Sequence, residues 1–298
     1  MKFNLLGKSE ISVSEIALGC MSLKPENLKE NIHLIHQAID NGINFLDTAD
    51  LYDFGENEIL IGRAIKGKRD EVIISSKVGN QWKSDKSGWT WNVSSDYIHS
   101  AIDQSLQRLQ VDYIDLYQIH GGTKEDNFEE VVETCNKLIK QGKIRAYGIS
   151  SIRPNVFQRF AKESSISSIM MQCSLLDTRP LPYLEFLKKN GISVLARGAF
   201  AQGALLGKET NAYLTHSPQD IKDITKLVDD LANEFQVSKE AITLAYLLKY
   251  LQITAAVIGL RTQKQLDNLL KAHKELQNIS INFNEVRFRK IDYSAHLD

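Results

Sequence analysis

The sequence predicts an α/β fold, specifically a closed (β/α)8 barrel built as one domain over residues 1–298. Eight short apolar segments that favour β-structure recur along the chain, and segments with helical periodicity separate most of them. The apolar segments show no polar alternation, which is typical of parallel strands buried on both faces. An open doubly wound sheet would have the same rhythm, but eight strand-like segments in a chain of 298 residues favour the barrel.

The elements are expected in a fixed order. Residues 1–14 predict a short hairpin, and the barrel strands are expected at residues 15–20, 43–47, 71–78, 113–120, 144–150, 167–173, 192–198 and 253–259. Ser94 or Ser95 suits the N-cap of the helical segment over residues 94–110, and Gly142 suits the position just after a helix end. Pro218 suits the first turn of an additional helix over residues 218–236. Residues 199–217 and the tail over residues 280–298 have no clear period.

The composition excludes several classes of protein. The chain is 43% hydrophobic and 24% charged with a formal net charge of −1, so no overall field draws it to nucleic acid or acidic lipid. Its three cysteines form no CxxC pair, so neither a zinc site nor a disulfide framework is indicated. It has no signal peptide and no apolar window of about 18 residues. We therefore expect a cytoplasmic protein without a metal, a nucleic-acid partner or a membrane span; the oligomeric state does not follow.

Ionisable side chains fall where three consecutive predicted strands end. The segment NFLDTADLYDFGENE, residues 44–58, has Asp47 at a strand end and Tyr52 just beyond it. The next two strands end at Lys77 and His120. Active sites of (β/α)8 barrels lie at the carboxyl ends of the strands, so these four side chains are expected to meet. The alternative for residues 44–58 is a solvated loop with helix-capping acids.

The four side chains suit the reduction of a carbonyl group. A lysine ammonium beside a tyrosine favours the phenolate and makes the hydroxyl a better acid. Asp47 would hold the ammonium of Lys77, and His120 would donate a hydrogen bond to a carbonyl oxygen. Together they form a general acid beside a polarised carbonyl. No side chain supplies a hydride, so a cofactor must carry it.

These residues also carry a resemblance. The segments LGCM, FLDTADLY, SSKVG, YIDLYQIH, GIS and CSLLDTRP resemble the aldo-keto reductases and come in that family's order over nearly the whole chain. The resemblance implies a TIM barrel, a catalytic tetrad of Asp47, Tyr52, Lys77 and His120, and NADPH bound across the barrel mouth without a metal. It implies cofactor contacts at Gly19, Cys20, Met21, Asp47, Ser150, Gln172, Arg197, Gly198, Ala201, Gly203, Gly259, Arg261, Thr262, Gln265 and Asn268.

The sequence agrees with a cofactor site of this kind. It contains neither GxGxxG after a strand nor GxxxxGK[ST], which disfavours a Rossmann or P-loop enzyme. Arg261, with Thr262 at a predicted helix start, suits a 2′-phosphate and so favours NADPH over NADH. The alternative for Arg261 is a solvated loop charge.

Three positions depart from the family pattern. Ser150 carries over, but Ser151 stands where the family has an asparagine that contacts the nicotinamide amide. Met170 stands where the family has a glutamine, although Gln172 faces the same side of the strand two residues later. Arg197 stands where a tyrosine stacks on the nicotinamide. Its planar guanidinium either stacks in the same way or pairs with a nearby carboxylate and serves the scaffold.

Two further features have two interpretations each. Trp82, Trp89 and Trp91 follow Lys77 closely and form either an apolar substrate wall or a loop that packs on itself. Cys20 is either a redox-sensitive thiol near the cofactor or a small buried filler.

We expect an NADPH-dependent enzyme that reduces aldehydes or ketones, with small-molecule carbonyl compounds as its substrates. A second hypothesis is an NADPH-binding, redox-reporting interaction protein with slow turnover, as potassium-channel β subunits of that family are. A third is a metal-dependent barrel hydrolase that uses Asp47, Asp50 and His120.

Overall fold

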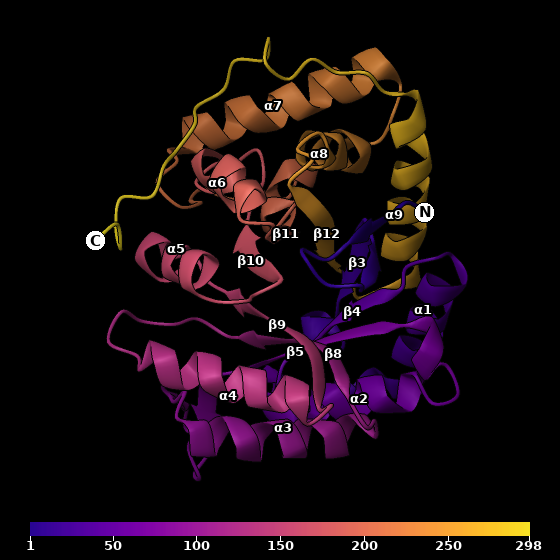
Figure 1. Cartoon of the computed structure of the whole chain (residues 1–298). Coiled ribbons are helices and arrows are strands. Elements are labelled where there is room, and N and C mark those ends of the chain that lie inside the picture. Colours follow the sequence, from indigo (N-terminus) through magenta and orange to yellow (C-terminus); the bar gives the residue numbers. More distant parts are fainter.

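The computed structural model describes residues 1–298 and contains a closed barrel of eight parallel strands (Figure 1). Around the barrel the order is β10-β11-β12-β3-β4-β5-β8-β9. The strands are β3 (Ile16–Gly19), β4 (Phe45–Asp47), β5 (Ile73–Val78), β8 (Ile114–Ile119), β9 (Ile144–Ser150), β10 (Ser168–Gln172), β11 (Ser193–Arg197) and β12 (Ile253–Gly259). All eight predicted strand segments are confirmed, most of them slightly shorter than expected.

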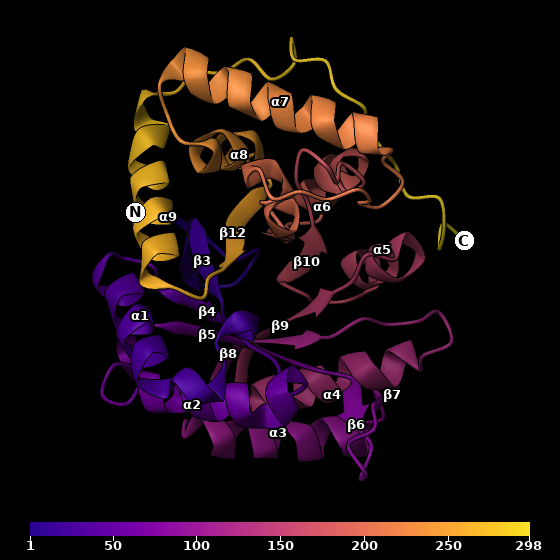
Figure 2. The same ribbon diagram turned by 180° about the vertical axis from the view of Figure 1, so that it is seen from behind.

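Helices surround the barrel on its outside, as both views show (Figures 1 and 2). They are α1 (Leu28–Asp40), α2 (Glu56–Ala64), α3 (Ser95–Leu109), α4 (Phe128–Lys140), α5 (Pro154–Glu163), α6 (Leu184–Lys189), α7 (Pro218–Phe235), α8 (Lys239–Leu248) and α9 (Gln263–Glu275). Ser94 caps α3 by accepting a hydrogen bond from the Tyr97 amide, and Gly142 has a φ of 73° after α4. The expected additional helix is α7, which lies outside α8. None of the helices is both long and apolar enough to span a membrane.

The predicted N-terminal hairpin closes the floor of the barrel. It consists of β1 (Phe3–Leu5) and β2 (Ser12–Ser14), which pair antiparallel. Leu6, Ile11 and Val13 from this hairpin are buried in the barrel interior, in one cluster with residues such as Phe45 and Leu116. Because apolar side chains fill the barrel axis from the amino-terminal end, the polar chemistry is confined to the opposite, carboxyl end of the strands.

Three long segments surround that carboxyl end. The first follows β5 and forms a small hairpin of β6 (Asn80–Trp82) and β7 (Trp89–Trp91). The second, residues 199–217, contains a 3-10 helix over Ala201–Leu206. The third is the C-terminal tail, which runs along α7 towards α5 (Figure 1). Ile291 anchors the tail, since its amide donates to the Thr178 hydroxyl at 2.7 Å and its carbonyl accepts from the same hydroxyl at 2.8 Å.

A close helix crossing supports the segment that carries Tyr52. Helix α2 begins one residue after the 3-10 turn over Tyr52–Gly55 and packs on the end of α3. At the crossing, a Cβ placed on Gly62 would lie 2.5 Å from the carbonyl oxygen of Leu109. Real Cβ atoms do not approach a main-chain oxygen this closely, so the absence of a side chain at Gly62 allows the two helices to approach.

Gly62→Ala tests the crossing. Alanine normally stabilises a helix relative to glycine by about 0.5–1 kcal/mol. At Gly62 we expect the reverse, a loss of roughly 1–3 kcal/mol in the free energy of unfolding, because the added methyl group forces α2 away from α3. Urea unfolding measures the change. A variant more stable than the wild type would show that the helices are not held at this distance.

Candidate active site

The ammonium group of Lys77 lies at the centre of the candidate site. Lys77 belongs to β5 and is 1% exposed. Its Nζ donates to Asp47 Oδ2 at 2.7 Å, to the carbonyl oxygen of Thr48 at 2.7 Å and to the Tyr52 hydroxyl at 3.3 Å. Because an ammonium group has three protons, these three acceptors saturate it and fix its position.

The same neighbours keep Lys77 charged. Burial lowers the pKa of Lys77, but the charges of Asp47 and Tyr52 and their hydrogen bonds offset burial and raise the pKa above its ordinary value. The ammonium group is therefore retained at neutral pH. It places a fixed positive charge beside the hydroxyl of Tyr52.

Two polar side chains that the sequence analysis did not single out hold Asp47. The Ser75 hydroxyl donates to Asp47 Oδ1 at 3.0 Å, and Gln118 Nε2 lies 3.4 Å from the same oxygen. Gln118 Nε2 also donates to Ser75 Oγ at 2.7 Å. Ser75 and Gln118 each precede a tetrad residue by two positions. The two-residue period of a strand, which places such positions on one face, was the signal available for finding them.

Tyr52 stands at the start of a turn with unusual backbone geometry. The next two residues, Asp53 and Phe54, have φ values of 49° and 58° although neither is glycine. Two contacts hold this turn: Lys24 Nζ donates to Asp53 Oδ1 at 2.6 Å, and the Phe54 and Trp82 ring centroids are 4.1 Å apart. The left-handed backbone is uncommon for such residues, and these contacts maintain it in the two residues that follow Tyr52.

His120 directly follows β8 and meets Tyr52 edge-on, with their ring centroids 6.0 Å apart. Burial, with smaller contributions from the charges of Lys77 and Arg197, lowers the pKa of His120 to about 3. The imidazole is therefore neutral at physiological pH. Its Nδ1 is buried without a hydrogen-bond partner, which leaves Nε2 as the nitrogen able to face a substrate.

Asp50 lies on a different side of the barrel wall. It is 8% exposed, and its Oδ2 faces the hydroxyl of Tyr97 in α3 at 3.5 Å. Burial, followed by the charge of Glu58 in α2, raises the pKa of Asp50 to about 8. Asp47 is bound to Lys77 instead, and no group of three His, Cys, Asp or Glu side chains is arranged to hold a metal. The geometry thus gives no support to the hydrolase hypothesis, and it corrects the alternative of a solvated loop, because both acids are buried.

Two predicted cofactor positions form a strip without side chains. Gly19 at the end of β3 is in register with Gly259 at the end of β12. A Cβ on Gly19 would lie 3.3 Å from a methyl group of Val257, so the strand ends present bare backbone to the mouth. Cys20 and Met21 follow in a 3-10 turn.

The side chains of this turn point in different directions. Met21 is 57% exposed, whereas Cys20 is fully buried. Burial raises the pKa of Cys20 well above its ordinary value, which favours the unreactive thiol and the interpretation as a buried filler. Any contact of Cys20 with a cofactor would come from its backbone.

At β10 the structure distinguishes Met170 from Gln172. Met170 is 2% exposed and belongs to the apolar interior of the barrel. Gln172, at the strand end, accepts a hydrogen bond from Arg197 Nη1 at 3.0 Å and donates one to the Tyr213 hydroxyl at 2.6 Å. The partner of Arg197 is thus an amide, and the expected alternative of a carboxylate partner is wrong. Ser150, at the end of β9, is in register with Met170.

Tyr213 is a residue that the sequence analysis missed, and it ties the 199–217 segment to the barrel through Gln172. Gly198, with a φ of 75°, directly precedes this segment, which itself contains Gly203 with a φ of 96° and the buried Ala201 with a φ of 47°. A Cβ on Gly198 would lie 3.0 Å from Cγ of Gln172. Glycine at these positions keeps the backbone close to the mouth.

The remaining predicted cofactor residues lie at the N-terminus of α9. Thr262 is its N-cap and accepts a hydrogen bond from the Gln265 amide, while Gln265 Oε1 accepts one from the Arg261 amide at 2.7 Å. Arg261, Thr262, Gln265 and Asn268 are all exposed. The Arg261 guanidinium has no ion-pair partner. A helix N-terminus with a free arginine beside it fits a phosphate group, so the residues present are compatible with a phosphorylated dinucleotide.

The three tryptophans do not form one wall. Trp82 stacks on Phe54 beside the tetrad, Trp89 is 51% exposed, and Trp91 packs partly buried against the main core. Trp82 and Trp91 thus pack on other side chains of the protein, as expected for a loop that packs on itself. The apolar substrate wall stays a prediction.

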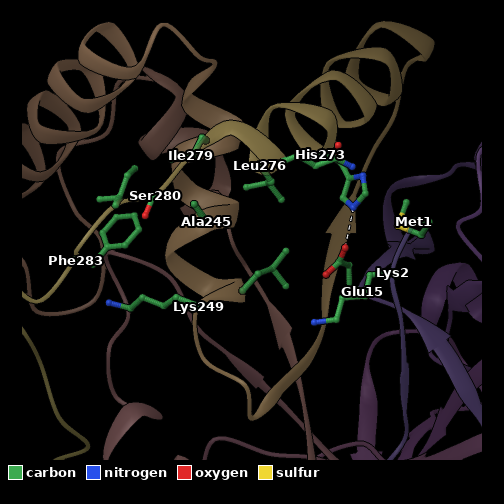
Figure 3. Close-up of a pocket in the computed structure, with 13 residues that line it drawn as sticks. Met1, Lys2, Glu15, Ala245, Lys249, His273, Leu276, Ile279, Ser280 and Phe283 are labelled. Carbon is green, nitrogen blue, oxygen red and sulfur yellow. Dashed lines mark hydrogen bonds and ion pairs between the residues drawn. The ribbon is translucent and has the colours of Figure 1, made fainter.

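A separate cavity of about 610 Å³ lies between α8, α9 and the N-terminus of the chain (Figure 3). None of the predicted site residues lines it. Its lining mixes apolar and polar side chains, and His273 Nε2 is paired with Glu15 Oε1 at 2.9 Å. The ammonium of Lys249 lies over the rings of Tyr246, Tyr250 and Phe283. These charged groups have partners within the protein, and the tetrad lies elsewhere.

A family model described as "Aldo/keto reductase family" matches residues 15–285. The "Uncharacterized oxidoreductase YqkF" of Bacillus subtilis is 42% identical over 281 residues, which cover 91% of each chain. The "NADH-specific methylglyoxal reductase" of Escherichia coli is 28% identical over 297 residues, covering 89% of this chain and 91% of that protein. Among solved structures, "aldo-keto reductase AKR11C1 from Bacillus halodurans (holo form)" matches with a TM-score of 0.90 and 37% identity over 100% of both chains.

The chain therefore belongs to the aldo/keto reductase family, and it is a carbonyl-reducing oxidoreductase. The resemblance found in the sequence is confirmed, and so is the (β/α)8 barrel.

The low pKa of His120 predicts how stability changes with pH. The ordinary value is 6.5 and the folded value is about 3. Between these values unfolding takes up a proton, so the free energy of unfolding falls as the pH drops. We expect His120→Gln to lose less stability than the wild type between pH 7 and pH 4, measured by urea unfolding at each pH. His33→Gln, on the exposed face of α1, is the control. Equal losses in His120→Gln and the wild type would contradict the lowered pKa.

Proposed function

We propose that this aldo/keto reductase reduces aldehydes or ketones to alcohols with NADPH as the hydride donor and Tyr52 as the proton donor. The observation that carries the proposal is the Tyr52 hydroxyl, 3.3 Å from an ammonium group that is buried, saturated and paired with Asp47. An acid of this kind serves a reaction in which negative charge develops on an oxygen atom.

Different side chains have different roles in protonating the carbonyl oxygen and stabilising the charge that develops. Tyr52 would transfer its proton to the carbonyl oxygen as negative charge develops there. Lys77 stabilises the negative charge left on the phenolic oxygen. Asp47 holds Lys77, and Ser75 and Gln118 hold Asp47 in turn. Since Lys77 has no remaining proton to donate, its contribution is electrostatic.

His120 is suited to orienting the carbonyl group. Because the imidazole is neutral and Nδ1 lacks a partner, a proton on Nε2 can donate a hydrogen bond to the same oxygen that Tyr52 protonates. Two donors on one oxygen would restrict the orientation of the carbonyl group.

A nicotinamide cofactor, when bound, supplies the hydride that no side chain supplies. The bare strand ends at Gly19 and Gly259 would leave room for it, and the N-terminus of α9 with Arg261 would hold the 2′-phosphate of NADPH. One relative is named as NADH-specific, so membership of the family does not decide between the nucleotides, and the choice of NADPH rests on the unpaired guanidinium of Arg261.

The mouth beside Tyr52 favours apolar substrates. Phe54, two residues after the proposed proton donor in the chain, is 45% exposed and stacks on Trp82, so the turn that carries Tyr52 also carries an exposed aromatic surface. Such a surface buries the apolar part of an aldehyde or ketone while its oxygen faces the tetrad. We expect aromatic aldehydes to be better substrates than small hydrophilic ones.

Tyr52→Phe tests the proton donor. We expect kcat for 4-nitrobenzaldehyde to fall by a factor of about 10²–10⁴, the range typical of a lost general acid. The NADPH dissociation constant, measured by quenching of tryptophan fluorescence, should stay within about twofold, because a single hydroxyl is removed and the ring remains.

The wild type discriminates between the functions considered. If the wild type bound NADPH tightly but showed negligible turnover, the result would contradict the reductase function and favour the hypothesis of a redox-reporting interaction protein. An unchanged kcat in Tyr52→Phe would remove Tyr52 from its role. Failure to bind either nucleotide would contradict the cofactor assignment.

Arg261→Ala tests the cofactor preference. Loss of a charge-assisted contact to the 2′-phosphate should weaken NADPH binding by about tenfold or more and leave NADH binding nearly unchanged. Lys271→Ala, in the last turns of the same helix with a 72% exposed side chain, is the control for a change of net charge. Equal weakening of both nucleotides in Arg261→Ala would show that Arg261 does not read the phosphate.

A further inference from the structure

One indole ring lies against the backbone beside two of the tetrad residues. Gly79 comes two residues after Lys77, and Gly121 directly follows His120. A Cβ on Gly79 would lie 2.6 Å from Cζ3 of Trp91, and a Cβ on Gly121 would lie 3.2 Å from the same atom. The six-membered ring of Trp91 therefore fills the space between two bare stretches of backbone, one at the end of β5 and one at the end of β8.

The β6–β7 hairpin holds the ring in this place. Its last residue, Trp91, is in register with Asn80, and the Asn92 amide donates to the carbonyl oxygen of Gly79 at 2.8 Å. The hairpin thus returns to the point where it left β5. Asn80 Nδ2 also donates to the carbonyl oxygen of His120 at 3.2 Å, so the hairpin contacts the histidine backbone on a second side.

A hydrogen bond connects the ring to the segment after His120. Trp91 Nε1 donates to Asp126 Oδ1 at 2.7 Å. Asp126 in turn accepts from the Thr123 amide on Oδ2 at 2.7 Å and from the Thr123 hydroxyl on Oδ1 at 2.9 Å. One carboxylate thus joins the indole to the loop over residues 121–127. Gly121 and Gly122 there have φ values of 144° and 108°.

The two flanking tetrad residues differ in how their side chains are held. Lys77 has three hydrogen bonds of its own and does not depend on the hairpin for its orientation. The imidazole of His120 makes no hydrogen bond to another protein group, and its Nδ1 is buried without a partner. Its position therefore follows from the backbone that carries it and from packing.

We propose that Trp91 is a positioning residue for His120: its ring and its hydrogen bond to Asp126 fix the backbone on which the imidazole stands. Trp91 touches neither the reacting atoms nor the proposed cofactor positions and acts through His120 alone. The inference rests on the proposed function, because it assigns Trp91 a part in orienting the carbonyl substrate.

Trp91→Phe, which keeps an aromatic ring and removes the N–H, is tested in a double-mutant cycle with His120→Ala. The measured quantity is kcat/KM for 4-nitrobenzaldehyde with NADPH. We expect a loss of about tenfold when His120 is present, the size typical of one lost hydrogen bond, and less than about twofold in the His120→Ala background. Trp89→Phe makes the same change at an exposed position of the same hairpin and should stay within about twofold of the wild type.

A second readout does not need turnover. In protein labelled with 13C-histidine, the His120 resonance, assigned by its absence from His120→Ala, should be shifted or broadened in Trp91→Phe and unchanged in Trp89→Phe. Asp126→Asn, which keeps the indole and weakens its acceptor, should have the same effect and covers the case that Trp91→Phe does not fold.

The outcomes separate the two proposals. Equal losses of kcat/KM with and without His120, or an unchanged His120 resonance in both Trp91→Phe and Asp126→Asn, would overturn the positioning role and leave the reductase intact. A wild type that binds NADPH without turnover would overturn the reductase, and the His120 resonance would still decide whether Trp91 positions the imidazole.

Discussion

The site depends on one buried ion pair. Lys77 and Asp47 are almost inaccessible to water, and a buried charge is tolerated only when it is paired and its remaining hydrogen-bonding capacity is used. The structure meets this condition with protein groups: the three protons of Lys77 each have an acceptor, and both oxygens of Asp47 have donors. Removing one partner would leave an uncompensated charge in the barrel. The same contacts that satisfy the pair also determine where the Tyr52 hydroxyl must lie.

Parallel pairing of adjacent strands makes this arrangement possible. Asp47 in β4 is in register with Ser75 in β5, and Lys77 in β5 is in register with Gln118 in β8. Asp47 and Ser75 therefore form one layer of neighbouring side chains, and Lys77 and Gln118 form the next layer, two residues further along β5 and β8. The floor below is sealed by apolar side chains from the N-terminal hairpin, so the polar layer has access to water only from the mouth. The mouth is also where the cofactor and the substrate would enter.

The sequence predicts the parts of this site that depend on local pattern. Strand ends could be located because apolar runs stop there, and the rule that barrel sites lie at carboxyl ends then brought Asp47, Lys77 and His120 together. The contact between Gln172 and Tyr213 could not be predicted, because it joins a strand end to a loop without periodicity 41 residues later. For the same reason the sequence left the roles of the three tryptophans open. Their different environments depend on the path of the β6–β7 hairpin, and the sequence of this loop has no periodic pattern from which that path could be predicted.

The contrast between Lys77 and His120 has a physical reason. A carboxylate hydrogen-bonded to Nδ1 would hold the imidazole firmly, but it would also favour the imidazolium and raise the pKa of the histidine towards neutrality. The positive charges of Lys77 and Arg197 and the burial of the ring act in the opposite direction. A histidine that must stay neutral beside a permanent ammonium group is therefore better held by its backbone than by a charged partner. Lys77, which must stay charged, requires the carboxylate that His120 cannot have. The site thus holds the charged Lys77 by hydrogen bonds and the neutral His120 by its backbone and packing. A buried ammonium group cannot do without a carboxylate partner, and a histidine with such a partner would not stay neutral.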